Sequence, residues 1–169
     1  HSSPIEKITS EGVQVGGQVY PCDDLVLATG FDAMTGALLA VDIRGREGLA
    51  LSEKWAAGPL TYLGLATRNF PNLFIVTGPG SPSVLSNMVQ SIEQHVEWIA
   101  DCVGYMEEKD LQSIEPNADA ESQWVAQVNE IAGETIFPSC NSWYLGANIP
   151  GKPRVFMPFL GFADYAAIC

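Results

Sequence analysis

The sequence predicts an α/β fold in which buried strands end in glycine turns and are followed by two long helices. Residues 25–29 and 73–77 are apolar runs without polar alternation, which is typical of strands buried on both faces. Each run ends in Thr-Gly, and open α/β sheets place their ligands at such strand ends. An apolar stripe at helical spacing then predicts a long helix from Leu85.

Residues 4–20 predict a small antiparallel meander that leads into the first buried run. Gly16-Gly17 is a hairpin signal between two segments of alternating polarity. Residues 33–39 and 49–57 predict two short helices, the first with Asp32 as a possible N-cap. Residues 62–65 predict one more strand.

The second half of the chain predicts two helices and an irregular loop. The apolar stripe of the first helix consists of Leu85, Met88, Ile92, Val96, Ile99, Val103 and Met106. Because this helix follows a strand and a Gly/Ser loop, its positive N-terminal end is expected to face the ligand edge. A second helix follows Pro116-Asn117. Residues 138–153 are rich in Pro and Gly, and Trp143 and Tyr144 favour a functional loop over a disordered one.

The composition excludes several classes of function. With 20 acidic and 8 basic residues and a net charge of −12, the chain lacks the basic footprint that nucleic acids and anionic membranes require. No Cys or His spacing fits a metal site, and no apolar run reaches the roughly 18 residues of a membrane span. Scattered cysteines favour the cytoplasm. The first residue is His1 rather than Met, and we expect a piece of a longer protein.

No catalytic group emerges from the residues alone. The sequence contains no Gly-x-Ser-x-Gly motif and no complete Gly-x-Gly-x-x-Gly fingerprint, and no Lys-Ser/Thr pair follows Gly78-Pro-Gly80. His95 lies in the middle of the predicted helix and is interpreted as a structural or surface histidine rather than a catalytic base. The sequence therefore predicts a ligand-binding edge without catalytic residues, as expected of the binding half of a larger enzyme.

Many short motifs, in one order, resemble the Baeyer–Villiger monooxygenases. This family is a branch of the flavoprotein monooxygenases with two dinucleotide-binding domains, and the resemblance is closest to its phenylacetone and steroid monooxygenase members. The segments that carry it are residues 24–32, 35–38, 42–45, 54–59, 70–74, 78–83, 85–88, 91–98, 142–152 and 154–157. The resemblance extends over nearly the whole chain.

The resemblance implies the C-terminal part of a Rossmann-like flavoprotein. Residues 1–24 would end the NADP domain, and residues 25–169 would belong to the FAD domain, with residues 138–153 as a lid. The implied reaction uses FAD, NADPH and O2 to convert a ketone to an ester or lactone through a C4a-peroxyflavin, in a cytoplasmic monomer. Both Rossmann fingerprints and the activating arginine would lie upstream. The alternatives are N- or S-oxygenation by a related flavoprotein, and a non-catalytic truncated fragment.

The resemblance also assigns individual residues. Met88 would offer its backbone N–H to the flavin, with a plain core methionine as the alternative. Trp143 would contact NADP, or else anchor the loop. Gly30 and Asp32 would lie where the two dinucleotide domains meet, unless Asp32 is only a helix cap. The substrate would lie beside Ser83, Val84 and Leu85, with Leu85 in direct contact and Met157 as a pocket wall.

Overall fold

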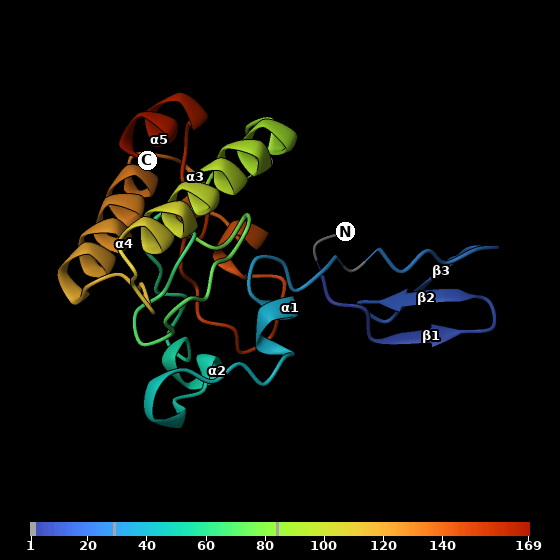
Figure 1. Cartoon of the computed structure of the whole chain (residues 1–169). Coiled ribbons are helices and arrows are strands. Elements are labelled where there is room, and N and C mark those ends of the chain that lie inside the picture. The colour runs from blue at the N-terminus through green and yellow to red at the C-terminus, as the bar shows by residue number, and fades with distance from the viewer. Residues whose placement is uncertain (1–2, 29, 84) are drawn as a thin grey trace. The chain divides into compact units, whose positions relative to one another are not determined.

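The computed structural model describes residues 3–28, 30–83 and 85–169, and the chain divides between Gly30 and Phe31 into two compact units. The first unit holds a three-stranded antiparallel sheet in the order β1-β2-β3 (Figure 1). Its strands are β1 (Lys7–Thr9), β2 (Gly12–Val15) and β3 (Gln18–Pro21). Gly16 and Gly17 both have positive φ in the turn between β2 and β3, as tight hairpins require. The predicted meander is confirmed.

Residues 25–28 do not form the predicted buried strand. The side chains of Val26 and Leu27 are 83% and 71% exposed, and Thr29 lies outside the described residues. A strand needs neighbours that take its backbone N–H and C=O groups. The described part of the chain supplies no sheet for this run, so the prediction is wrong here. The predicted glycine turn is present, because Gly30 has a φ of 79°.

The second unit is built from helices and long connections. Its helices are α1 (Gly36–Leu39), η1 (Arg46–Gly48), α2 (Leu51–Lys54), α3 (Met88–Glu108), α4 (Ala118–Gly133), η2 (Phe137–Ser139), η3 (Trp143–Leu145) and α5 (Phe162–Ile168). The two predicted short helices are confirmed in shorter form as α1 and α2. Asp32 is not the N-cap of α1, because the helix begins after Thr35.

The predicted strands at 62–65 and 73–77 are also wrong. Tyr62 and Ala66 form only an isolated bridge, and residues 73–77 are irregular. Left-handed backbone interrupts both runs, with φ of 58° at Leu63 and 56° at Thr77. The side chains of Leu63, Leu65 and Ile75 are nevertheless buried, so the apolar runs build core from loops rather than from a sheet.

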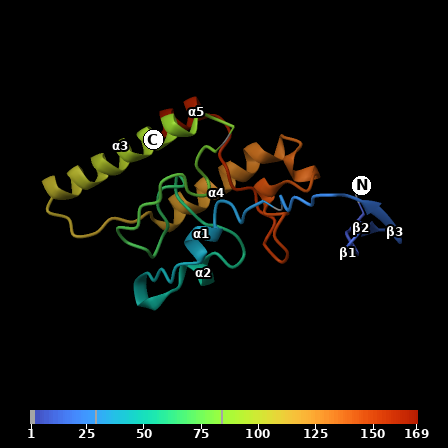
Figure 2. The same cartoon turned by 90° about the vertical axis from the view of Figure 1, so that its right-hand side faces the viewer.

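Helix α3 starts at Met88, three residues later than predicted. Asn87 is its N-cap, and the Asn87 side chain accepts hydrogen bonds from the Val89 and Gln90 N–H groups. The predicted apolar stripe is largely exposed, with Val96 at 52%, whereas the residues buried on α3 are Ser91 and His95. Figure 2 shows the link from the end of α3 back to α4. The polar side of α3 therefore faces the core of this unit.

The main core lies around α4 and α5. Trp124 stacks on Phe159, with ring centroids 5.1 Å apart, and Tyr165 donates a hydrogen bond to the Leu63 carbonyl at 2.8 Å. The buried members of this cluster are Leu63, Leu65, Trp124, Val128, Ala132, Tyr144, Leu145, Phe156, Phe159 and Tyr165. A smaller core contains Leu51, Trp55, Phe70 and Ile75. Within the described residues, no helix combines the length and hydropathy needed to cross a membrane.

Candidate functional site

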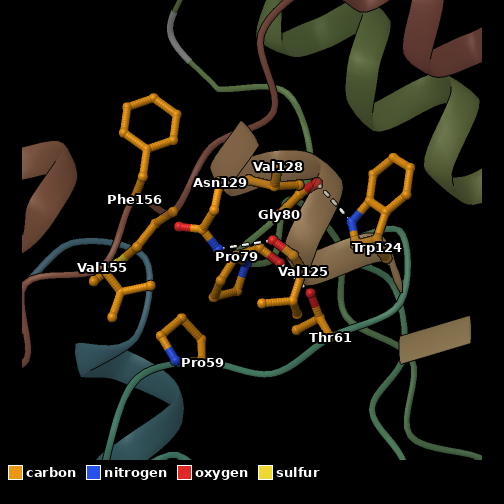
Figure 3. Close-up of a pocket in the computed structure, with 11 residues that line it drawn as sticks. Pro59, Thr61, Pro79, Gly80, Trp124, Val125, Val128, Asn129, Val155 and Phe156 are labelled. Carbon is orange, nitrogen blue, oxygen red and sulfur yellow. Dashed lines mark hydrogen bonds between the residues drawn. The ribbon is translucent and has the colours of Figure 1, made fainter. Parts of the chain in front are cut away.

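The segment 77–83, which leads from the core towards α3, is held rigidly by side chains from distant elements. The Thr61 hydroxyl donates to the Pro79 carbonyl at 2.6 Å, and the Trp124 indole N–H of α4 donates to the Gly80 carbonyl at 3.1 Å (Figure 3). Both contacts are buried, where a hydrogen bond is strongest and its loss most costly. The segment is therefore tied to α4 before it reaches the helix.

Backbone contacts complete this support. The Phe159 N–H donates to the Ser81 carbonyl at 2.9 Å, and the Ser81 hydroxyl donates to the Gly78 carbonyl at 2.7 Å. Gly64 and Gly78 approach so closely that a Cβ atom on either one would clash with the backbone of the segment or with Gly64 itself. The glycines of this region are thus required by backbone packing.

A small cavity lies behind the segment, between Gly80 and α4 (Figure 3). Its volume is about 10 Å³, which is room for one water molecule at most. The residues that line it include Pro59, Thr61, Pro79, Gly80, Trp124, Val128 and Met157. The cavity is too small for a ketone or a cofactor.

The N-terminus of α3 offers a free donor. Asn87 accepts from Val89 and Gln90, and the Ser91 N–H donates to the Asn87 carbonyl at 3.1 Å. Among the described residues none accepts the Met88 N–H. The first turn of α3 carries no acidic side chain, so the positive end of the helix dipole is not neutralised. This end of α3 can stabilise an anionic or electron-rich group.

The predicted substrate-side residues differ in exposure. Leu85 is 55% exposed, as a contact residue must be. Ser83 is buried, and its hydroxyl has no hydrogen-bond partner among the described residues. Val84 lies outside the described residues. Met157 is almost fully buried, and its carbonyl accepts from the Gly80 N–H, so its side chain belongs to the interior behind the segment.

Trp143 lies on η3 in the predicted loop. Trp143 is 39% exposed, and its ring stacks on Tyr144, with centroids 4.1 Å apart. Tyr144 and Leu145 are buried in the main core and anchor the loop. Trp143 therefore presents part of its ring outward from a fixed support, and its role towards NADP stays a prediction.

The loop of residues 138–153 is fastened to the start of the second unit. Lys152 forms an ion pair with the Asp32 carboxylate and donates to the Ala33 carbonyl at 3.0 Å. The Asn148 side-chain amide donates to the Phe31 carbonyl at 2.8 Å. Sequence reasoning missed Lys152, although a lone cation in the loop of residues 138–153 was the available signal. Gly30 belongs to the first unit.

His95 is fully buried on α3, as the structural interpretation of this histidine requires. Its Nδ1 atom accepts a hydrogen bond from the Thr77 N–H at 3.2 Å, and its ring packs edge-on against Tyr165. Burial lowers the pKa of His95 from 6.5 to about 4. The imidazole is therefore neutral at physiological pH. Within the described residues, no group of three or more His, Cys, Asp or Glu side chains could hold a metal ion.

The lowered pKa of His95 predicts a loss of stability in acid. The unfolded chain binds a proton with a pKa near 6.5 and the folded chain only near 4, so stability is full above pH 6.5 and falls as the pH is lowered to 4. The expected total loss is about 3 kcal/mol. Urea unfolding at a series of pH values measures it. His95→Asn, which cannot titrate, is the control, and an equally steep pH dependence in that variant would contradict the assignment.

Comparison with known proteins shows close relatives along nearly the whole chain. No family model matches the sequence. A Baeyer-Villiger monooxygenase of Pseudooceanicola batsensis is 42% identical over 166 residues, or 97% of this chain. A cyclohexanone 1,2-monooxygenase of an Acinetobacter species is 43% identical over 95% of the chain, and a phenazine N-monooxygenase of Lysobacter antibioticus is 42% identical over 98%. The chain spans about 30% of the length of these relatives.

Solved structures give the same result. A cyclohexanone monooxygenase from a Rhodococcus species bound to NADP+ superimposes with a TM-score of 0.88 at 42% identity, over 98% of this chain and 31% of that one. An oxidised steroid monooxygenase bound to NADP superimposes with a TM-score of 0.83 at 49% identity, over 99% of this chain and 31% of that one. The predicted resemblance and fold class are thereby confirmed.

Proposed function

We propose, from the premise that this chain is homologous to a segment of the Baeyer–Villiger monooxygenases, that it forms part of a longer enzyme that oxidises ketones to esters or lactones with O2 and NADPH. The observation that carries the proposal is identity of 42% and more, over nearly the whole chain, to enzymes named for this chemistry. The matched length includes the segment 77–83 and the start of α3, where we place the binding edge.

The residues at the start of α3 fit a flavin. The Met88 N–H has no acceptor among the described residues and stands at a helix end without acidic side chains, which suits an electron-rich ring edge. Leu85 is exposed beside it. FAD, when bound, would supply the oxygen-activating redox chemistry, and a relative from Aspergillus aculeatus is named an FAD-binding monooxygenase. In our proposal Met88 holds the cofactor and Leu85 contacts the ketone, and Ser83, Val84 and Met157 keep the substrate-side roles that the resemblance implies.

The loop of residues 138–153 suits a role as a lid for NADPH. Trp143 is partly exposed and stacks on the buried Tyr144, and aromatic rings of this kind bind flat cofactors well. The ion pair between Lys152 and Asp32 sets the position of the loop. A lid fixed in this way would exclude water from the reacting atoms.

Exposed apolar surface supports the proposal that this chain works inside a longer protein. The outward face of α3 carries Val89, Val96 and Val103, all exposed, and residues 25–27 are exposed as well. Contiguous apolar surface on a soluble protein usually marks an interaction site. We infer that other parts of the full-length protein cover these residues. Cytoplasmic location agrees with four free cysteines, and a monomeric state stays a prediction.

Purification of the full-length protein tests the function. We expect a yellow protein that oxidises NADPH faster when a cyclic or aryl ketone is added and that yields the ester or lactone by mass spectrometry. The separately expressed 169-residue chain is expected to be colourless. A full-length protein without flavin, or one that consumes NADPH without ester formation, would contradict the proposal.

N-oxygenation is the second candidate, because the phenazine N-monooxygenase is as similar to this chain as the ketone-oxidising relatives are. The two activities differ in the atom that is attacked, a carbonyl carbon or a ring nitrogen. Parallel assays with a ketone and with phenazine separate them. Formation of an N-oxide without ester would support the second candidate and reject the first.

A further inference from the structure

The buried His95 and the half-buried Thr77 form a hydrogen-bonded pair that joins α3 to the segment in front of it. His95 lies on the inner face of α3, two turns after the helix begins, and its side chain has no exposed surface. Its Nδ1 atom accepts the Thr77 N–H at 3.2 Å. Since Nδ1 is the acceptor, the neutral ring carries its proton on Nε2. Protonation of Nδ1 would abolish the bond, and burial keeps the ring neutral.

Thr77 has a conformation that its residue type disfavours. Its φ is 56°, in the left-handed region, where a β-branched side chain is strained. The residue is immediately followed by Gly78, whose backbone packs against Gly64 without space for a side chain. The left-handed turn at Thr77 therefore sets where the segment 78–83 begins.

A second unfavourable feature lies on the opposite side of the His95 ring from Thr77. The Nε2 atom of His95 is buried and has no hydrogen-bond partner among the described residues. A buried donor without a partner is unfavourable, and so is the strained backbone at Thr77. Such costs persist where a position serves function rather than stability. The residues that bear these two costs, His95 and Thr77, are joined by one hydrogen bond.

We propose that His95 is a positioning residue for the cofactor edge, which holds Thr77 in the left-handed turn and thereby places the segment 78–83 against the N-terminus of α3. The hydrogen bond joins two parts of the structure whose separation must stay fixed. One end is the start of the segment, and the other is the helix whose first turn carries the Met88 N–H. The link from His95 to the cofactor rests on the proposed flavin role of Met88. The positioning of the segment by His95 does not depend on that role.

Two replacements of His95 separate the hydrogen bond from packing. His95→Asn keeps an acceptor oxygen at the place of Nδ1 but loses volume. His95→Leu keeps the volume but has no acceptor. If the hydrogen bond matters, the Asn variant resembles the natural protein and the Leu variant does not. A role in packing alone predicts the opposite order.

The first measurement is hydrogen exchange of the Gly80 and Ser81 amides in the full-length protein. Both amides donate within the fold, to Met157 and Gly78 respectively. We expect at least tenfold faster exchange in His95→Leu and less than threefold change in His95→Asn. Thr77→Gly, added to His95→Leu, is expected to restore slow exchange, because glycine adopts positive φ without strain. Failure of this rescue, or faster exchange in the Asn variant than in the Leu variant, would overturn the positioning role.

The second measurement is the dissociation constant of FAD, followed by flavin fluorescence. We expect weaker binding by about tenfold in His95→Leu and recovery in the double variant with Thr77→Gly. If exchange changes while FAD affinity does not, the link from His95 to the cofactor is rejected. If the full-length protein binds no FAD, the proposed function fails, and the exchange experiment alone decides the positioning role.

Discussion

Replacement of Glu121 by Ala is expected to lower the free energy of unfolding by about 3–5 kcal/mol. The Glu121 carboxylate on α4 is buried and accepts hydrogen bonds from Lys54 of α2 at 2.9 Å, from the Thr67 hydroxyl at 3.1 Å and from the Arg68 N–H at 2.7 Å. Removal of the carboxylate leaves the Lys54 ammonium buried and without its counter-ion. The Arg68 N–H loses its acceptor as well, whereas the Thr67 hydroxyl keeps the Leu60 carbonyl at 2.7 Å. The smaller core also loses its tie to α4.

Urea unfolding of the protein measures this effect. Glu130→Ala is the matched control, because Glu130 is an exposed residue on the same helix and should change stability by less than about 0.5 kcal/mol. Joint replacement of Lys54 by Met and Glu121 by Leu removes both charges and is expected to recover most of the loss. Equal effects of Glu121→Ala and Glu130→Ala would show that the buried ion pair is not needed.

Trp124→Ala is expected to lower the free energy of unfolding by about 3–5 kcal/mol, because it removes aromatic contacts from the core. The indole ring stacks on Phe159 and packs edge-on against Tyr165 in the main core. Its N–H donates to the Gly80 carbonyl, so the substitution also frees the segment 77–83. Stability and FAD affinity are therefore expected to fall together.

Trp124→Phe separates the loss of apolar contact from the loss of the hydrogen bond to Gly80. Phenylalanine keeps most of the apolar contact but leaves the buried Gly80 carbonyl without its donor, which is expected to cost about 1–3 kcal/mol. Thermal unfolding and flavin titration of both variants provide the measurements. Trp143→Ala serves as the control, since Trp143 is 39% exposed, and its effect on stability is expected to be smaller. A larger loss for Trp143→Ala than for Trp124→Ala would contradict the placement of Trp124 at the centre of the core.

Local patterns in the sequence predicted the elements that depend on local interactions. Gly16-Gly17 predicted the hairpin, and three- and four-residue spacing predicted α3 and α4. The strands at 25–29, 62–65 and 73–77 failed because strand formation depends on partners elsewhere in the chain. The start of α3 was misplaced because the cap residue Asn87 outweighs the apolar Leu85 in setting a helix boundary.

The candidate site was predicted from family resemblance, whereas its supporting contacts were not predicted at all. Resemblance assigned roles to Met88, Leu85 and Trp143 but gave no positions or contacts for them. The supports join residues that are far apart in sequence, by 67 positions for Lys54 and Glu121 and by 120 for Asp32 and Lys152. No periodicity or motif connects such residues. The apolar stripe of α3 was recognised, but its direction depends on surroundings that the described residues do not contain.

The bond between Asp32 and Lys152 has a consequence for the order of events during synthesis. The carboxylate leaves the ribosome 120 residues before its lysine partner. At ordinary rates of translation, that interval is roughly 6 to 24 seconds. The segment after Gly30 therefore emerges first, and Asp32 lacks its lysine partner while α1 to α4 are synthesised. The ion pair that joins the start of the second unit to the loop of residues 138–153 can form only after Lys152 has emerged.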